Sequence, residues 1–357
     1  MKFLKILLFP FAILYGCLTW VRNRLYDAHL LSSTSFDIPL IVVGNLSMGG
    51  TGKSPHIEYL IRLLKNEFKI TTLSLGYGRN SEGFILAQDT STANEIGDEP
   101  LQFKTKFPEI KVAVDAKRVN GINKLLQYPP APNVILLDDA FQHRAVKAGF
   151  YVLLTDYQKL YVNDFMFPTG TLREFRSGAK RADIIIVTKC PVNLSEEKKK
   201  DIINRLHPSP NQKIYFSFIK YGELVQVKPS TNNNNLINQI NILNKDISIL
   251  LLTGIANPKP IESHLEGKVK SIVPATFSDH HQFSEKDMMA ILNLFNTIAS
   301  ENKILVTTEK DWMRLKSSVH LNLLSNLPLF YLPIEIDFNN NDKQQFNNQI
   351  LKYVRGN

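Results

Sequence analysis

The residues best suited to chemistry are Lys53 and Ser54, which end the stretch VVGNLSMGGTGKSP at residues 42–55. A lysine and a hydroxyl residue after a run of glycines are typical of a phosphate-binding loop. In such a loop the lysine pairs the β- and γ-phosphates and the hydroxyl binds Mg²⁺. The alternative is a glycine-rich turn that carries a chance lysine. The aliphatic strand before the glycines and the helix expected after them favour the loop, because free amides at a helix N-terminus bind phosphate.

One position of this stretch departs from the strict pattern G-x-x-x-x-G-K-[ST]. Counting back from the lysine, glycine is expected at residue 47, where the chain has serine. Gly44 and Gly49 supply turn freedom on either side, since glycine adopts conformations that other residues avoid. We therefore predict a nucleotide-binding loop that comprises Ser47, Met48, Gly49, Gly50, Thr51, Gly52, Lys53 and Ser54.

A second candidate is the stretch VILLDDAFQHR at residues 134–144, where an aliphatic strand ends in Asp138 and Asp139. An acid pair at the end of a buried strand is typical of the carboxylates that hold Mg²⁺ in phosphoryl-transfer enzymes, directly or through water. The alternative is that an aspartate caps the next helix. Two adjacent acids followed by Gln142, His143 and Arg144 exceed what capping requires, so we favour the functional interpretation.

Three acidic clusters are less specific. IGDEP at residues 96–100 is by itself typical of a helix start with proline in its first turn. FSDHHQF at 277–283 contains Asp279 beside two histidines, a possible acid–base pair, and zinc is disfavoured because no third ligand has suitable spacing. TEKDW at 308–312 follows a strand and is equally consistent with a solvated helix start.

Basic turns offer a surface for an anionic acceptor. GYGR at residues 76–79 places Arg79 after a strand, and PTGTLREFRSGAKR at 168–181 contains Arg173 and three further cations. Arginines that converge on one site bind phosphate or carboxylate groups. The alternative is an ordinary solvated charged face.

Short aliphatic segments that alternate with helical ones must position these residues. Segments typical of buried strands lie at 38–45, 70–78, 111–116, 134–139, 151–156 and 183–189, and a helix is expected at 55–66. Such runs predict a mostly parallel sheet that binds its ligand at the carboxyl ends of the strands. The predicted fold class is α/β with a core like that of P-loop nucleotide triphosphatases.

The pattern changes after residue 210, and we predict a second, smaller α/β domain. Residues 213–229 have β character without a helix between them, and the Asn-rich residues 230–246 are expected to form an exposed loop or hairpin tip. Further strands are expected at 247–256, 269–277, 303–308 and 329–338, with a helix at 285–300. The predicted domains are 1–30, 31–212 and 213–357, with a β-hairpin linker and a last helix that could pack back on the core.

The N-terminus carries a charge-free apolar run from Ile6 to Trp20, with Lys2 and Lys5 before it and arginines after it. This run is shorter than the roughly 20 residues that a spanning helix needs. A cleaved signal peptide is disfavoured, because the sequence after this run has no A-x-A cleavage site. A buried core helix remains an alternative. We favour a helix that lies in or dips into the cytoplasmic leaflet.

Composition restricts the partners without choosing among them. The chain has 42 Lys+Arg and 33 Asp+Glu, giving a formal net charge of +9 that suits anionic lipid, nucleic acid or phosphorylated substrates. The two cysteines, Cys17 and Cys190, have no metal-type spacing and fit a reducing compartment.

Together these motifs resemble one family, the tetraacyldisaccharide 4′-kinases. The resemblance rests on GNLSMGGTGKSP, GYGR, GDEP, DDAFQHR, GTLRE, GIANP, DHH and TEKD, which follow in order from residue 44 to 311. The serine at 47 is part of the family's loop pattern. The chain departs from it at Leu75, Ala140 and Phe175, which concerns acceptor contacts more than the reaction.

The resemblance implies transfer of the γ-phosphoryl group of ATP, with Mg²⁺, to the 4′-hydroxyl of a lipid disaccharide 1-phosphate. It implies that Lys53 and its loop hold the triphosphate, and that Ser54, Glu99 and Asp138 contribute to the metal shell.

The resemblance also assigns roles in proton transfer. Asp98 matches the base toward the acceptor hydroxyl, His280 the histidine that assists it, and Asp139 a support for that histidine. Arg79, Arg173 and Asn257 are candidates for binding the acceptor. Because His280 falls in the second domain, we expect domain closure over ATP to assemble the site.

Two alternatives remain open. One is another P-loop enzyme, such as a small-molecule kinase or a GTPase, suggested by DIIIVTKC at 183–190 although no aspartate follows Lys189 at the expected place. The other is a membrane-associated nucleotide triphosphatase that acts as a conformational switch. We expect the chain at the cytoplasmic face of the bacterial inner membrane, bound peripherally or by one N-terminal anchor, with no nucleic-acid or protein partner.

Overall fold

The computed structural model describes residues 2–227, 238–240, 243–279 and 281–356, which group into two compact units. Unit 1 comprises residues 1–89, 103–219 and 336–357, and unit 2 comprises residues 90–102 and 220–335. This grouping differs from a simple split near residue 213. The short segment 90–102, which contains Asp98, groups with unit 2, and the C-terminal segment groups with unit 1.

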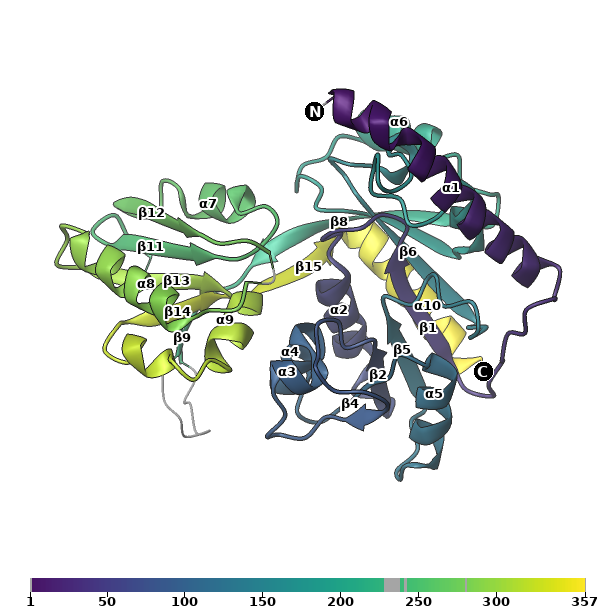
Figure 1. Cartoon of the computed structure of the whole chain (residues 1–357), viewed down its shortest axis with the longest axis horizontal. Helices are drawn as coiled ribbons and strands as arrows, with labels where there is room; N and C mark the ends of the chain where they lie inside the picture. Colours follow the sequence, from purple (N-terminus) through teal and green to yellow (C-terminus); the bar gives the residue numbers. More distant parts are fainter. Residues whose placement is uncertain (1, 228–237, 241–242, 280, 357) are drawn as a thin grey trace. The chain divides into compact units, whose positions relative to one another are not determined.

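Unit 1 is built on a nine-stranded sheet of order β15-β8-β7-β6-β1-β5-β2-β4-β3. Figure 1 labels several of its strands, among them β1, β5 and β6. The strands are β1 (Leu40–Asn45), β2 (Ile70–Ser74), β3 (Ile85–Leu86), β4 (Lys111–Val114), β5 (Val134–Asp138), β6 (Phe150–Asp156), β7 (Ile184–Thr188), β8 (Lys213–Tyr221) and β15 (Ile334–Phe338). The neighbours from β8 across to β4 pair in parallel, whereas β3 is antiparallel to β4. The expected parallel sheet is confirmed.

Helices cover both faces of this sheet, as near-continuous aliphatic strands require. The helices of this part of the chain are α1 (Lys2–Asp27), α2 (Lys53–Leu64), α5 (Arg118–Gln127), α6 (Glu196–Leu206) and α10 (Asn340–Arg355), with 3₁₀ turns η1 (Tyr161–Asn163) and η2 (Arg176–Arg181). The helix α4 (Asp98–Lys106) begins in unit 2 and ends in unit 1. α2 and α10 meet through Tyr59 and Phe346, whose ring centroids are 5.8 Å apart. Leu125 of α5 and Leu206 of α6 pack in the core on the opposite face.

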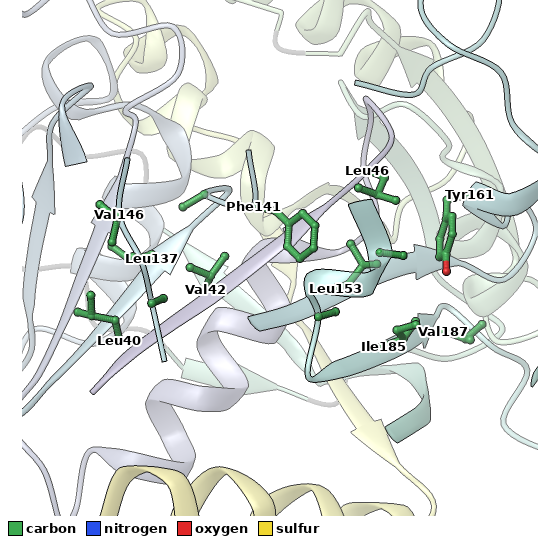
Figure 2. Packing of buried hydrophobic residues seen from close by; sticks show 14 of the residues in the cluster. Leu40, Val42, Leu46, Leu137, Phe141, Val146, Leu153, Tyr161, Ile185 and Val187 are labelled. Atoms are coloured by element: carbon green, nitrogen blue, oxygen red, sulfur yellow. The ribbon is translucent and has the colours of Figure 1, made fainter. Parts of the chain in front are cut away.

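Figure 2 shows this core, in which side chains from adjacent strands interdigitate. Val42, Leu137, Leu153 and Ile185 come from four neighbouring strands and are almost completely buried. Phe141 packs directly on the backbone of β1, where a Cβ added at Gly44 would lie 2.7 Å from the Phe141 Cβ. Glycine at 44 therefore allows the close approach between β1 and the loop after β5.

Unit 2 contains a six-stranded sheet of order β10-β9-β14-β13-β11-β12. Its strands are β9 (Leu224–Val227), β10 (Asn238–Ile240), β11 (Ser248–Thr253), β12 (Ser271–Thr276), β13 (Lys303–Thr308) and β14 (Leu329–Leu332). Its helices are α3 (Ala93–Ile96), α7 (Lys259–Leu265), α8 (Glu285–Thr297) and α9 (Glu309–Lys316), with the 3₁₀ turn η3 (Leu321–Leu324). Ser284 and Asp287 form a capping box that fixes the start of α8.

Two expected segments differ from the prediction. Residues 329–338 were expected to form one strand, but Pro333 separates β14 from β15, and these strands belong to different sheets. Proline lacks the N–H that a continuing ladder needs, so the chain leaves one sheet there. Residues 213–229 likewise form β8 and β9 in different sheets, and most of the Asn-rich stretch lies outside the described residues.

The helix α1 has an unusual distribution of side chains. Eight of its exposed residues are large and apolar, namely Leu7, Phe9, Phe11, Ile13, Leu14, Leu18, Trp20 and Val21, whereas Ala12 is buried. The exposed charged residues Arg22, Arg24 and Asp27 lie at its C-terminal end. Among the described helices, none combines the length and hydropathy needed to cross a bilayer. α1 therefore exposes an apolar surface and packs against the rest of unit 1 through the face that contains Ala12.

Candidate active site

The loop between β1 and α2 presents backbone amides to an open space. Gly49 and Gly52 have φ values of 111° and 86°, in the region that only glycine enters at little cost. A Cβ added at Gly49 or Gly50 would meet no atom within 4 Å. No described side chain caps the first turn of α2 at Gly52. The loop and the helix N-terminus together form a cradle for an anion.

The first half of the loop is anchored to the segment after η1. The backbone of Met48 donates to the Thr171 carbonyl at 2.7 Å, and Ser47 forms an isolated bridge with Leu172. Thr51 is buried, and its hydroxyl accepts from the Asn45 side chain at 2.8 Å. Ser47, Met48 and Thr51 thus set the shape of the loop, which leaves the glycines and Lys53 to face a ligand.

Two residues that the sequence interpretation did not assign also brace the loop. His56 contacts the Gly52 carbonyl through Nδ1 at 2.6 Å and the Ser217 hydroxyl through Nε2 at 3.0 Å. Burial lowers the pKa of His56 to about 4, so its ring is neutral near pH 7. Lys189, after β7, donates its ammonium to the Gly50 carbonyl and to Asp156 at 2.8 Å.

Lys53 lies at the start of α2 among polar groups. Its Nζ is 3.5 Å from Asp139 Oδ2 and 3.5 Å from Asn45 Oδ1. Arg173 donates to both carboxylate oxygens of Asp139 at 3.0 and 3.1 Å, and to Asn45 Oδ1 at 3.1 Å. Burial alone would raise the pKa of Asp139, but the positive charges of Lys53 and Arg173 outweigh it and hold that pKa below its usual range.

Asp138 ends β5, directly beside β1, where it is in register with Val43. It is buried and accepts from the Ser74 hydroxyl at 3.3 Å. Asp139 follows with φ 48°, a left-handed conformation that turns its side chain away from the strand direction. The structure thus brings Lys53, Asp138 and Asp139 to the carboxyl ends of two adjacent strands.

The donor set fits Mg²⁺ bound together with a nucleotide. Ser54 is half-buried in the first turn of α2, and Asp138 carries a carboxylate at the neighbouring strand end. In the described part of the chain, no group of three or more His, Cys, Asp or Glu side chains could hold a metal ion. Mg²⁺ commonly uses one or two protein ligands and completes its shell with phosphates and water, so a small donor set suits it.

The other candidate acids lie in unit 2. Asp98 is the first residue of α4, is buried, and accepts from Arg314 Nε at 2.7 Å. Glu99 pairs with Lys310 at 3.1 Å. His280 lies outside the described residues. The neighbouring His281 contacts Asp287 at 3.0 Å through Nε2.

The remaining predicted acceptor contacts lie in turns. Arg79 donates to the carbonyl of Gly83 at 2.7 Å, within its own loop. Asn257 is exposed, and its side-chain oxygen accepts from the backbone of Lys259 at 3.2 Å, just before α7. Within unit 1, Arg173 lies beside the phosphate-binding loop, where it donates to Asp139 and Asn45.

A further polar network joins α1 to the loop after β5. Asn23 donates to Glu174 at 2.7 Å, and Gln142 donates to Glu174 at 3.0 Å and to the Asn45 carbonyl at 2.9 Å. Arg181 pairs with the same Glu174 at 2.7 Å. Glu174 is only 2% exposed, and these internal donors supply the hydrogen bonds that its buried carboxylate needs. Apart from its charged residues, nothing in the sequence GTLRE predicted that Glu174 is a buried acceptor of hydrogen bonds from α1 and from the loop after β5.

Comparisons with known proteins agree with this geometry. A family model described as tetraacyldisaccharide-1-P 4'-kinase matches residues 4–355. A tetraacyldisaccharide 4'-kinase of Flavobacterium johnsoniae is 52% identical over 357 residues, which cover 100% of this chain and 99% of the relative. One of Bacteroides thetaiotaomicron is 46% identical over 359 residues, with 98% and 93% covered.

A solved structure extends the likeness to three dimensions. The crystal structure described as the "apo" form of LpxK from Aquifex aeolicus in complex with ATP matches with a TM-score of 0.74 and 26% identity. The match covers 98% of this chain and 99% of that one. The chain described here therefore belongs to the tetraacyldisaccharide-1-P 4'-kinase family.

Proposed function

We propose that this protein transfers the γ-phosphoryl group of ATP to the 4′-hydroxyl of a tetraacyldisaccharide 1-phosphate, a step of lipid A biosynthesis. One observation carries the proposal: an open phosphate cradle with Lys53 faces the Asp138–Asp139 strand end, in a chain that belongs to this kinase family. A membrane-associated nucleotide triphosphatase that only switches conformation is the alternative, and it would use the same cradle.

The nucleotide is bound by the loop from Ser47 to Ser54. Amides of the glycines and of the first turn of α2 donate to phosphate oxygens, and the Lys53 ammonium exchanges its 3.5 Å contacts with Asp139 and Asn45 for phosphate. The low pKa of Asp139 keeps it anionic near neutral pH, so it orients both Lys53 and Arg173.

Ser54 and Asp138 are the proposed metal-binding groups of unit 1, and Glu99 is a third candidate. Mg²⁺ would neutralise charge on the phosphates, which is what a loose phosphoryl-transfer transition state requires. Glu99 is held by Lys310 at 3.1 Å, a contact that a cation would displace.

Asp98 is the proposed base toward the acceptor hydroxyl, with His280 in an assisting role and Asp139 as its support. A sugar hydroxyl is a poor nucleophile, and a carboxylate within hydrogen-bond reach can accept its proton late in the transfer. Arg79 and Asn257 are proposed to bind the acceptor. Arg173 is bonded to Asp139, so we place its role nearer the transferred phosphate.

The apolar face of α1 supports peripheral association with a membrane, which is where a tetraacylated acceptor resides. Eight apolar residues of this helix are exposed, and arginines follow at its C-terminal end. Replacing Phe11, Leu14 and Leu18 with serine should reduce flotation with anionic phospholipid vesicles, whereas serine at the half-buried Leu25 tests general loss of structure.

The reaction itself is tested with radiolabelled ATP and a tetraacyl disaccharide 1-phosphate in mixed micelles. Label in the lipid fraction that depends on the added enzyme supports the proposal. Release of free phosphate without labelled lipid would support the switch instead. Lys53→Ala should strongly reduce both activities, and Lys65→Ala at the far end of α2 is the matched control.

A further inference from the structure

Three separate sequence motifs of unit 2 meet at one side chain, Arg314 of α9. Its Nε donates to Asp98 of the GDEP motif at 2.7 Å. Its Nη1 donates to Asp311 of the TEKD motif at 3.0 Å and to the carbonyl of Gly254, in the GIANP motif, at 3.1 Å. The Arg314 side chain has 0% exposure, so these contacts form in the interior of the unit.

Asp311 holds the Nη1 end of the Arg314 guanidinium, whereas Asp98 bonds to its Nε. One of its carboxylate oxygens accepts from the backbone of Gly254 at 2.9 Å and from the Thr308 hydroxyl at 2.7 Å. The other oxygen accepts from Arg314. Thr308 in turn caps the start of α9 by accepting from the backbone of Asp311 at 3.0 Å. The guanidinium therefore has a single orientation, set by the end of β13 and the start of α9.

The identity of the residue is informative. Arg314 is the single arginine in the sequence of unit 2, where the other permanent cations are lysines. A planar guanidinium can donate along several fixed directions at once, which a lysine ammonium cannot reproduce at the same positions. A buried arginine that spans three motifs is thus suited to fixing the orientation of a carboxylate, as well as balancing its charge.

We propose that Arg314 is a positioning residue for phosphoryl transfer, which holds the Asp98 carboxylate in a fixed orientation as the proton acceptor. This inference rests on the proposed function, in which Asp98 is the base. In that step the acceptor O–H bond breaks and its proton passes to Asp98. The acceptor oxygen bonds to the γ-phosphorus, and the bond to the bridging oxygen breaks to release ADP.

The groups beside Asp98 have partners of their own. Glu99, the next residue, pairs with Lys310 at 3.1 Å, and Lys310 lies 3.8 Å from Asp279. Asp311 is buried and accepts from the same guanidinium at a different nitrogen. Arg314 bonds directly to Asp98, so a change in the shape of this side chain moves the carboxylate.

The test exchanges Arg314 for lysine, which keeps the charge and loses the directed donors. For Arg314→Lys we expect kcat to fall by about 10- to 100-fold, as expected when a catalytic group is misplaced by about 1 Å. The affinity for a fluorescent ATP analogue should remain that of the wild type. Lys303→Arg is a charge-conserving control in unit 2, because Lys303 donates to backbone carbonyls at the end of α8.

Arg314→Gln removes both the charge and the directed donors, and supplies a second readout. Its kcat should fall at least as far as that of Arg314→Lys, while the affinity for the ATP analogue stays that of the wild type. A wild-type kcat in both variants would overturn the inference. Parallel losses of ATP affinity and kcat in Arg314→Lys would also overturn it, in favour of a purely structural role.

The proposed function fails by a different outcome. If the wild-type protein binds ATP but labels no lipid, the kinase assignment is wrong whatever Arg314 does. If the wild type labels lipid and Asp98→Asn does so equally well, Asp98 is not the base, and the inference about Arg314 falls with it.

Discussion

Two arginine–aspartate pairs serve the two halves of this chain in contrasting ways. In unit 1, Arg173 and Asp139 have side chains that are 22% and 31% exposed. In unit 2, the corresponding values for Arg314 and Asp98 are 0% and 10%. The first pair borders the open phosphate cradle, whereas the second belongs to a closed hydrogen-bond network. Both pairs join a guanidinium to a carboxylate. They differ in whether these groups can exchange each other for the atoms of a bound ligand.

The half-buried pair of unit 1 can exchange partners at lower cost than the fully buried pair of unit 2. Water already screens its charges, and Lys53 contacts Asp139 and Asn45 only at 3.5 Å, near the limit of a hydrogen bond. Phosphate oxygens can therefore replace these contacts. The buried pair cannot be opened without leaving a charge in the interior. Unit 1 is thus built to receive a charged ligand, and unit 2 to hold one carboxylate in place beforehand.

The largest expected effect is a loss of kcat when Lys53, beside the Arg173–Asp139 pair of unit 1, is replaced. Lys53→Ala should lower kcat by about 10²- to 10³-fold, because it removes a preorganised cation from the transferred phosphate. Thermal stability should change little, since the Lys53 contacts are long. Lipid phosphorylation and thermal unfolding measured on the same sample check both statements, with Lys65→Ala as the control. A large drop in stability would show that Lys53 is structural and would break the contrast.

The comparison itself is tested by exchanging each arginine for methionine. Arg314→Met should lower the free energy of unfolding of unit 2 by about 3–5 kcal/mol, because buried carboxylates lose their partner. Arg173→Met should cost less than about 1 kcal/mol, as for other exposed pairs. Urea unfolding, followed by hydrogen exchange of each unit, measures both values. Equal losses in the two variants would refute the distinction between a rearrangeable and a fixed pair.

A smaller effect is expected at Lys189, which braces the cradle from outside. Lys189→Met keeps the aliphatic stem and removes the bonds to the Gly50 carbonyl and Asp156. We expect KM for ATP to rise about 3- to 10-fold at nearly constant kcat, the equivalent of one lost hydrogen bond. A fall in kcat at constant KM would instead place Lys189 in the transfer step. Lys199→Met, whose lysine pairs with Glu196, is the control.

The smallest effect concerns acid stability. The folded protein holds the pKa of Asp139 below its usual value, so the ionised carboxylate stabilises the fold above the unfolded pKa of about 4. That contribution is lost as pH falls through the lower, folded pKa. Asp139→Asn should therefore be slightly less stable than wild type at pH 7, and the difference should shrink toward pH 3. A constant difference across this range in thermal unfolding would contradict the ionic origin.

Local patterns predicted the strand, loop and helix that form the cradle. The strand at 40–45, the glycine loop and the helix from Lys53 are contiguous, so their chemistry can be inferred from neighbouring residues. The acid pair after β5 was predicted for the same reason, because its strand is a continuous aliphatic run. These elements depend on short-range rules of strands, turns and helix termini.

The second network could not be predicted in this way. Arg314 and Asp98 are 216 residues apart in sequence, and Arg314 follows TEKDW, a stretch that was equally consistent with the solvated start of a helix. Its burial depends on the order of strands in unit 2, which periodicity does not reveal. Lys189 was noted for a resemblance to another nucleotide motif, and its bond to the phosphate loop follows from β7, β6 and β1 being consecutive in the sheet.

The contacts of α1 affect how the protein can be shortened. The helix directs apolar side chains outward, yet its C-terminal half supplies Asn23 to the buried Glu174 and Arg22 to the Gln142 carbonyl. A chain that begins after Asp27 would gain solubility and expose an acid that now has internal donors. Gln142 also bonds to the end of β1, so the disturbance would reach the cradle. We therefore expect that α1 cannot be removed without disturbing the rest of unit 1. Replacing its exposed apolar side chains is the better way to obtain a more soluble enzyme.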